Sequence, residues 1–200
     1  MNTKKNSTNN LDSLEDNKII NLVDSHPIEE YKDNIRNPGI DFRLDEISSI
    51  SINKSAVERR CSNYGTRRSI KKDKQAAWLL KAISLMDLTT LSGDDTEARV
   101  KRLCRKAKQP ISSNLEKQLG VQSLNLSVAA VCVYHDMLSA AKNAITDTNI
   151  HLAAVSTGFP AGLSPLPLRL QEIEYSVDSG ANEIDIVISR RHVLEGNWEA

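Results

Sequence analysis

The amino-acid sequence predicts an α/β fold built on a parallel sheet, and three observations support this prediction. First, short apolar runs recur along residues 75–200, and they are continuous, as in strands that helices cover. Second, the segments between these runs have apolar residues at helical spacing. Third, the two kinds of segment alternate through four strands, which is the order of parallel β/α units.

Four segments have the composition of strands. The second is a compact run of apolar and β-branched residues, and the third is followed by the turn-forming sequence GFPAG. A helix over 74–83 leads into the first strand. The predicted strands are 85–90, 127–134, 152–157 and 183–188.

Three helices are predicted between these strands from apolar side chains three and four residues apart. For the first helix, Asp94 and Glu97 have the spacing of a capping pair, and we expect Asp94 and Asp95 to cap it. The three stripes are Val100, Leu103, Cys104 and Ala107; Leu138, Ala141 and Ile145; and Leu166, Leu170, Ile173 and Val177.

The start of the third helix is also predicted. Ser164 is a candidate cap for it. Pro165 and Pro167 then fall in the first turn, where proline is tolerated because its missing N–H has no partner there in any case.

The composition changes near residue 75 and divides the chain into three parts. Residues 1–38 are rich in Asn, Ser, Asp and Lys, and we expect them to be disordered because they have little apolar surface to bury. Residues 39–74 form a basic, helical segment, and 75–200 form the main domain. The basic side chains between 59 and 74 suggest either a phosphate or nucleic-acid patch or a solvated helix flank. The flank is favoured because Tyr64 is the one aromatic residue among the charges.

Charge and cysteine content narrow the functional classes. Lys and Arg number 26, as do Asp and Glu, so the formal charge is zero and we expect no nucleic-acid or membrane partner. The 3 cysteines and 4 histidines are scattered, so we expect no disulfide framework, no metal and no cofactor. The amino terminus has no secretory h-region and no run reaches about 20 apolar residues, so we expect a cytoplasmic protein.

Polar residues inside the predicted strands indicate a site. Side chains alternate along a strand, so Asp185 points away from the isoleucines that flank it. Asp87 and Thr89 share one face of the first strand, and Cys132 lies on one face of the second. In a parallel barrel these side chains would face one interior, which opens at the carboxyl ends of the strands.

Several of these segments carry a family resemblance. The stretches QAAWLLKAISLMDLTTLSGDDT, AAVCVY, GFPAG and GANEIDIVI, in this order and spacing, resemble deoxyribose-phosphate aldolases of the eukaryotic type. The resemblance covers roughly residues 40–200. It implies a (β/α)8 TIM barrel of the class I aldolase type, interrupted here after about the fourth strand. It also implies reversible cleavage of 2-deoxy-D-ribose 5-phosphate to acetaldehyde and glyceraldehyde 3-phosphate through a Schiff base, without metal, in deoxyribonucleotide catabolism.

The resemblance also implies roles for individual residues. Asp185 falls on the family's acid/base aspartate, which relays a proton through water; its alternative role is to orient a buried lysine. Asp87 and Thr89 fall at the substrate end of the first strand, where substrate contact and structural hydrogen bonding are equally good interpretations. Cys132 falls beside the site, although a small buried residue is the simpler interpretation. His135 stands where relatives often have proline, and we interpret it as incidental.

One part of the family pattern is missing from the sequence. The Lys-Thr-Ser-Thr-Gly-Lys run that holds the Schiff-base lysine does not occur, and Lys81, the nearest candidate, is better explained as helix surface or strand entry. We therefore expect the 200 residues to be an incomplete product that is inactive alone. The alternatives are a truncated, non-catalytic relative that binds a partner, and an aldolase-type barrel for a related sugar phosphate. Assembly into a homo-oligomer is a further hypothesis.

Overall fold

The structure, a computed structural model, describes residues 41–67 and 69–200. These residues fall into two compact units. One unit is Lys72–Ser189, and the other combines the described residues before it with Arg190–Ala200. The segment 1–38, for which we expect disorder, lies outside the described residues. Within the described ranges, no helix has the length and apolar character needed to cross a bilayer.

The smaller unit is made of short helices that bury no residue. Asn53 caps the longest of them, because its side chain accepts a hydrogen bond from the backbone N–H of Ala56 at 3.0 Å. The guanidinium of Arg67 lies 4.6 Å from the centre of the Tyr64 ring, so this aromatic residue stacks on a neighbouring cation. The elements are α2 (Leu44–Ser48), α3 (Lys54–Ser62), the 3-10 helix η1 (Tyr64–Thr66) and α9 (Arg190–Leu194).

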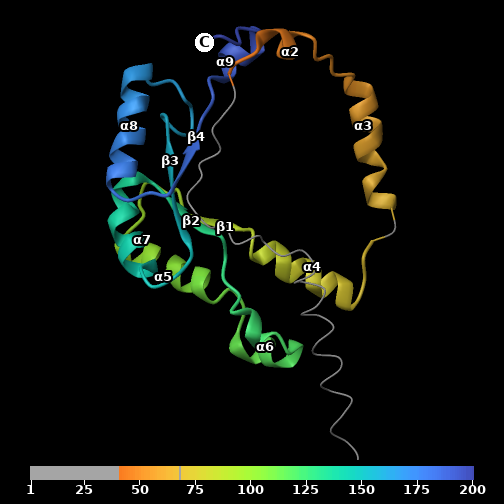
Figure 1. Cartoon of the computed structure of the whole chain (residues 1–200), viewed down its shortest axis with the longest axis vertical. Helices are drawn as coiled ribbons and strands as arrows, with labels where there is room; N and C mark the ends of the chain where they lie inside the picture. Colours follow the sequence, from red (N-terminus) through yellow and green to blue (C-terminus); the bar gives the residue numbers. More distant parts are fainter. Residues whose placement is uncertain (1–40, 68) are drawn as a thin grey trace, which may run out of the picture. The chain divides into compact units, whose positions relative to one another are not determined.

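The larger unit contains a parallel sheet of four strands in the order β1-β2-β3-β4, with helices between them (Figure 1). The predicted α/β class and all four predicted strands are confirmed, although three strands are shorter than predicted and the third begins and ends one residue earlier. The strands are β1 (Asp87–Thr89), β2 (Ala130–Val133), β3 (His151–Ser156) and β4 (Glu183–Ile186). A sheet in which each strand lies beside the next strand in sequence is the arrangement of the first half of a (β/α)8 barrel.

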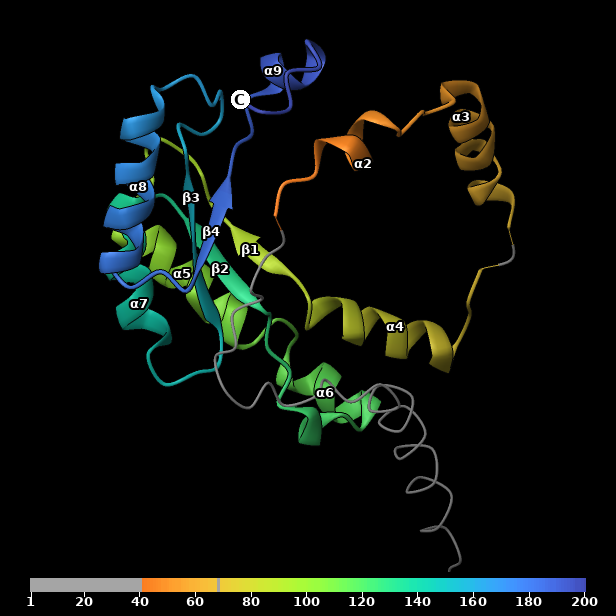
Figure 2. The ribbon, with the colours of Figure 1, turned by 45° about the horizontal axis from the view of Figure 1, so that its top comes forward.

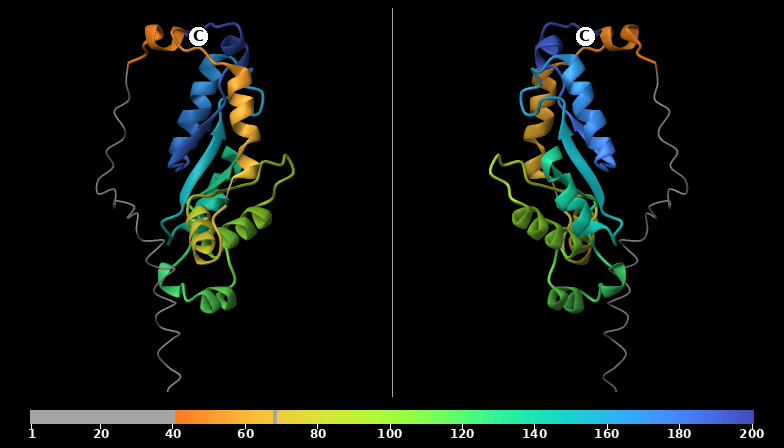
Figure 3. Two further views of the ribbon diagram at one scale, coloured as in Figure 1. Left: turned by 90° about the vertical axis from the view of Figure 1, so that its right-hand side faces the viewer. Right: turned by 90° about the vertical axis from the view of Figure 1, so that its left-hand side faces the viewer.

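Helices cover one face of this sheet, as Figure 2 shows for α5, α7 and α8. The side views in Figure 3 show α8 running alongside the strands. The helices and 3-10 turns of the unit are α4 (Asp73–Ile83), α5 (Glu97–Lys108), α6 (Ser113–Leu119), η2 (Gln122–Leu124), η3 (His135–Met137), α7 (Leu138–Ile145) and α8 (Leu166–Asp178).

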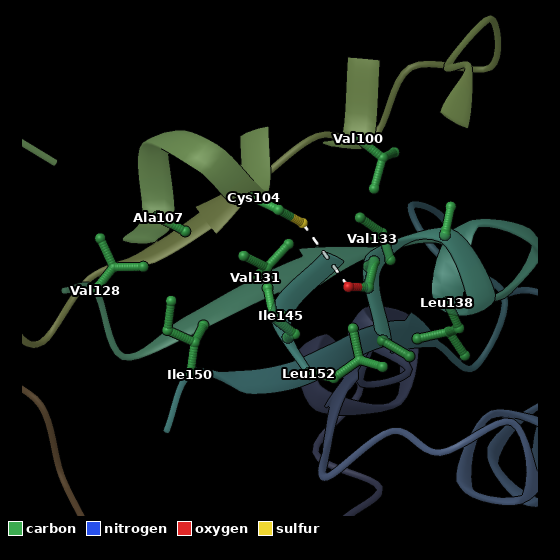
Figure 4. Packing of buried hydrophobic residues seen from close by; sticks show 13 residues of the cluster. Val100, Cys104, Ala107, Val128, Val131, Val133, Leu138, Ile145, Ile150 and Leu152 are labelled. Atoms are coloured by element: carbon green, nitrogen blue, oxygen red, sulfur yellow. Dashed lines mark hydrogen bonds between the residues drawn. The ribbon is translucent and has the colours of Figure 1, made fainter. Parts of the chain in front are cut away.

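The main core lies between the sheet and helices α5 and α7. Outward-facing strand residues such as Val131 and Leu152 meet the predicted helix stripes there, and Val100, Cys104 and Leu138 are fully buried (Figure 4). The Cys104 thiol donates to the Ala141 carbonyl at 4.0 Å. The apolar stripes predicted for α5 and α7 are therefore confirmed as core.

A second apolar cluster fixes the helix that precedes β1. Leu80 of α4 packs with Val121 and Leu126, which belong to the connection between α6 and β2. Gly120 ends α6 in the left-handed conformation at φ 66°, a common way for a helix to stop. This cluster holds α4 against the sheet-bearing unit, so β1 begins at a fixed position.

The start of α5 corrects the predicted cap. Thr96, rather than Asp94 or Asp95, is the N-cap, and its hydroxyl accepts from the backbone N–H of Arg99 at 3.3 Å. Glu97 does not reach back to the cap and instead binds Lys101 one turn along the helix at 2.9 Å. Both aspartates pair with the Arg99 guanidinium, at 3.1 and 3.2 Å.

Asp95 instead anchors the loop that follows β1. Its carboxylate accepts hydrogen bonds from the Thr90 hydroxyl at 2.9 Å and from the backbone N–H of Ser92 at 3.1 Å. Burial acts to raise the pKa of Asp95, but these hydrogen bonds and the Arg99 contact lower it below its ordinary value. Asp95, which the sequence suggested as a helix cap, thus connects the loop to Thr90 directly after the first strand.

The third predicted helix is confirmed as α8, but most of its apolar stripe is exposed. Leu166, Leu170 and Val177 of α8 are 58%, 55% and 45% exposed, whereas Ser176 is fully buried. The helix contacts β3 and β4, and Ile173 is the one member of the stripe that is half-buried. The β4 residue Ile186 is likewise 57% exposed.

The predicted cap of α8 is wrong. Pro165 occupies the N-cap position and no side chain caps the helix, while Pro167 lies in the first turn as predicted. Ser164 instead lies against Gly158, where a Cβ added to the glycine would come 2.9 Å from the serine Oγ. This close approach, together with φ of +75°, explains the glycine.

Candidate functional site

The face of the sheet opposite the core carries the predicted site residues. In the strand register Thr89 lies beside Cys132, Cys132 lies beside Ala153, and Asp185 lies beside Val155. Partners in register point to the same side of a parallel sheet. The prediction from strand alternation is therefore confirmed: Asp87, Thr89, Cys132 and Asp185 share one face, which we call the inner face.

A small apolar cluster forms the middle of the inner face. Ala130, Cys132, Ala153 and Val155 pack together and are at most 3% exposed, with Leu91, Tyr134 and Phe159 at the margin. The aromatic rings of Tyr134 and Phe159 meet edge to face with their centres 6.1 Å apart. Small side chains thus form the centre of the face, while carboxylates stand on the two flanking strands.

Asp87 lies at the end of this face nearest the α4 side. Burial raises its pKa, and so do the negative charges of Glu183 and Asp185, while His151 acts in the opposite direction. The two neighbouring carboxylates therefore favour retention of a proton by Asp87. An aspartate with a raised pKa is closer to the range in which a carboxyl group exchanges protons at neutral pH.

Cys132 lies between the carboxylates. The pKa of its thiol is raised from 9.0 to about 11, chiefly by burial and then by the charges of Asp185 and Asp87, while a hydrogen bond with Thr89 opposes the rise. The thiol is therefore neutral at physiological pH and is a poor nucleophile. We therefore interpret Cys132 as part of a small, uncharged surface of the site and not as a group that reacts covalently.

Asp185 has no hydrogen-bond or ion-pair partner within residues 41–67 and 69–200, and its side chain is exposed. An aspartate that is not bound to the protein around it is available to water or to a ligand. The alternative role in the sequence prediction, to orient a buried lysine, needs a cation that strands β1–β4 do not contain.

Sequence reasoning missed a second pair of residues on the same face. The Nδ1 atom of His151 and the Oε1 atom of Glu183 are 2.5 Å apart, and both residues lie nearer the amino ends of the strands than Asp185. The predicted third strand began at 152, so His151 was not assigned to it. Its alternation with Ala153 and Val155 is the signal that would have placed it on the inner face.

The loop after β3 is held tightly where the strands end. Thr157 has φ of +61°, which is rare for a β-branched residue, and its hydroxyl both accepts from the backbone N–H of Val187 at 2.6 Å and donates to the Val187 carbonyl at 3.2 Å. Glu172 accepts from the backbone N–H of Gly158 at 2.7 Å. Gly162, at φ +68°, leaves no room for a side chain, because a Cβ there would lie 2.8 Å from Val187.

The remaining candidates lie elsewhere. His135 is in η3, where its ring meets Tyr175 edge to face at 5.9 Å, outside the inner-face cluster. Lys81 is in the last turn of α4, in agreement with its interpretation as helix surface or strand entry. In the part of the chain that the structure describes, no three His, Cys, Asp or Glu side chains are placed to hold a metal ion.

Comparison with known proteins agrees with this geometry. No protein-family model matches the chain. Over 164 residues, 81% of the chain is 49% identical to the deoxyribose-phosphate aldolase of Mus musculus, and 82% of it is 49% identical over 166 residues to that of Homo sapiens. The enzyme of Bos taurus is 48% identical over 164 residues. The chain spans about half the length of these curated relatives, at 52% of each. Over about four fifths of its length, the chain is therefore similar to deoxyribose-phosphate aldolases.

Proposed function

We propose that this chain supplies the acid/base half of an aldolase site that cleaves 2-deoxy-D-ribose 5-phosphate to acetaldehyde and glyceraldehyde 3-phosphate. The observation that carries the proposal is the shared inner face, where Asp185 and Asp87 stand on either side of the neutral thiol of Cys132. The 49% identity to relatives named for this activity supports the choice of substrate.

In the proposed reaction Asp185 moves protons through water as the carbinolamine forms and loses water. The raised pKa of Asp87 suits it to hydrogen-bond a substrate hydroxyl, with Thr89 beside it on the same strand. Cys132 shapes the apolar centre against which the short carbon chain of the sugar would lie. These residues act on the substrate without forming a covalent bond to it.

The covalent step requires an amine that the described strands do not carry. A Schiff base forms when an uncharged lysine attacks the substrate carbonyl, and a desolvated strand position is what lowers a lysine pKa enough for this. None of β1–β4 contains a lysine. We therefore expect the 200-residue chain alone to show no retro-aldol turnover and no adduct with substrate after borohydride reduction.

A hybrid protein tests the proposal. The chain is joined to the portion of the Mus musculus relative that lies outside the alignment, and release of glyceraldehyde 3-phosphate from 2-deoxyribose 5-phosphate is followed with a coupled assay. We expect turnover by the hybrid, and a loss of about a hundredfold or more in kcat for Asp185→Asn, as for removal of a general acid/base.

Asp147→Asn is the matched control, because Asp147 is an exposed aspartate that follows α7 away from the inner face. It should leave turnover unchanged. A hybrid that is folded by circular dichroism but retains near-normal turnover with Asp185→Asn would remove the assigned role.

A further inference from the structure

A pocket of about 410 Å³ lies between η3 and one flank of α8. Its walls come from the turn after β2 and from one flank of α8, which contact each other directly through the His135 and Tyr175 rings. Both elements belong to the unit Lys72–Ser189. The pocket is separate from the inner face, because the side chains that line it are not those of the inner-face cluster.

Two carboxylates without cations line this pocket. Asp136 is exposed, and it forms no ion pair with the described part of the chain. Glu172 uses one oxygen, Oε2, to accept from the backbone N–H of Gly158 at 2.7 Å, and it too lacks a cationic partner among the described residues. No Lys or Arg is among the lining residues, so the pocket has a net negative charge.

The other walls add acceptors and an aromatic ring. Ser164 and Gln171 contribute a hydroxyl and an amide, and Tyr175 is 55% exposed, so part of its ring is accessible. The Nδ1 atom of His135 is buried in the protein without a partner, so this ring can meet a ligand only through its other edge. Leu168 is the single aliphatic side chain of the lining.

We propose that this pocket binds a guanidinium group on an alkyl chain. Guanidinium offers five N–H donors in a plane, which match two carboxylates and the neighbouring amide and hydroxyl oxygens better than the three donors of an ammonium. It is also weakly hydrated and stacks on aromatic rings such as Tyr175. The volume of about 410 Å³ exceeds that of the head group and leaves room for an alkyl stem. The site is independent of aldol chemistry.

Two probes distinguish the sources of such a group. Agmatine represents a free alkylguanidinium, and an acetylated Gly-Gly-Arg-Gly-Gly amide represents an arginine side chain of another protein. Each is titrated into the full chain at low salt, with backbone amide shifts in η3 and α8 as the readout. N-butylurea, a neutral compound of similar shape, is the comparison ligand. We expect saturable shifts confined to these two elements with the guanidinium probes and none with the urea.

Charge-removing variants complete the test. Asp136→Asn should weaken binding about three- to fivefold, which is the range of one exposed ion pair, and Tyr175→Leu should also weaken it. Asp147→Asn, which removes an exposed carboxylate outside the pocket, should not change binding. A peptide that binds tighter than agmatine would assign the site to a protein partner, and equal affinities would assign it to a free ligand. Equal shifts with N-butylurea, or unchanged affinity in folded Asp136→Asn, would overturn the proposal.

Discussion

The reactivity of the Cys132 thiol is a direct measure of the charges on the inner face. Its pKa is raised from 9.0 to about 11, and burial is the largest cause, followed by Asp185 and Asp87. A shift of two units corresponds to about 3 kcal/mol in favour of the neutral thiol and to about a hundredfold less thiolate at a given pH below 9. We therefore expect alkylation of Cys132 to remain slow up to pH 9.

Substitutions should change this reactivity in opposite directions. Asp185→Asn or Asp87→Asn removes a negative charge that disfavours the thiolate, so each should speed alkylation a few-fold, and by less than about tenfold because burial remains. Thr89→Val removes the hydrogen bond that stabilises the thiolate and should slow alkylation further. The three variants have similar side-chain volumes to the residues they replace.

The assay is iodoacetamide labelling between pH 7 and 9, resolved by peptide mass spectrometry. Cys61 is exposed and serves as the internal reference in the same sample, while circular dichroism reports whether each variant is folded. If Cys132 in the folded parent chain reacts as fast as Cys61 at pH 8, the reasoning about burial is wrong. If neither Asp→Asn variant alters the rate, the carboxylates do not face the thiol.

Three further predictions concern stability and pH. Gly162→Ala should lower the free energy of unfolding by about 2–4 kcal/mol in urea titrations, because it combines a left-handed φ with a clash against Val187; an unchanged midpoint would contradict the loop geometry. Leu152→Ala in the core should cost about 2–5 kcal/mol, whereas Leu170→Ala on the exposed flank of α8 should cost less than about 1 kcal/mol; equal effects would show that α8 is covered. The pKa of Asp95 is lowered on folding, so its stabilisation is present above the unfolded-state pKa and is lost as pH falls through the folded-state value. Asp95→Asn should therefore be less stable than the parent at pH 7 and converge with it toward pH 2 in thermal melts.

Strand alternation was sufficient to predict the inner face. Asp185 and Cys132 lie within apolar runs. Because side chains alternate between the two faces of a strand, a residue that does not face the helices must face the other side of the sheet. The strands did not need exact ends for this, because parity does not change when a strand is shortened. The part of the site that depends only on parity was therefore predictable.

Features that depend on competition between neighbouring residues were not predictable. Thr96, Asp94 and Asp95 are all good N-cap residues. The two aspartates instead bind Arg99 and the Thr90 hydroxyl, which lie within five residues of them, and Thr96 is left to cap the helix. The exposed flank of α8 has the same helical periodicity as a buried stripe. Periodicity identifies the apolar side of a helix, and burial depends on whether another element lies against it.

The double hydrogen bond of Thr157 also fixes which side chains of β4 belong to the site. If β4 slipped by one residue against β3, every side chain of β4 would exchange faces, so isoleucine would take the place of Asp185 on the inner face and the carboxylate would enter the apolar core. The backbone ladder alone permits such a slip, since its hydrogen bonds repeat at each step. The hydrogen bonds between the Thr157 hydroxyl and the backbone of Val187, in contrast, can form in one register only. This threonine therefore fixes the register of β4 against β3, and the register determines that Asp185 lies on the inner face.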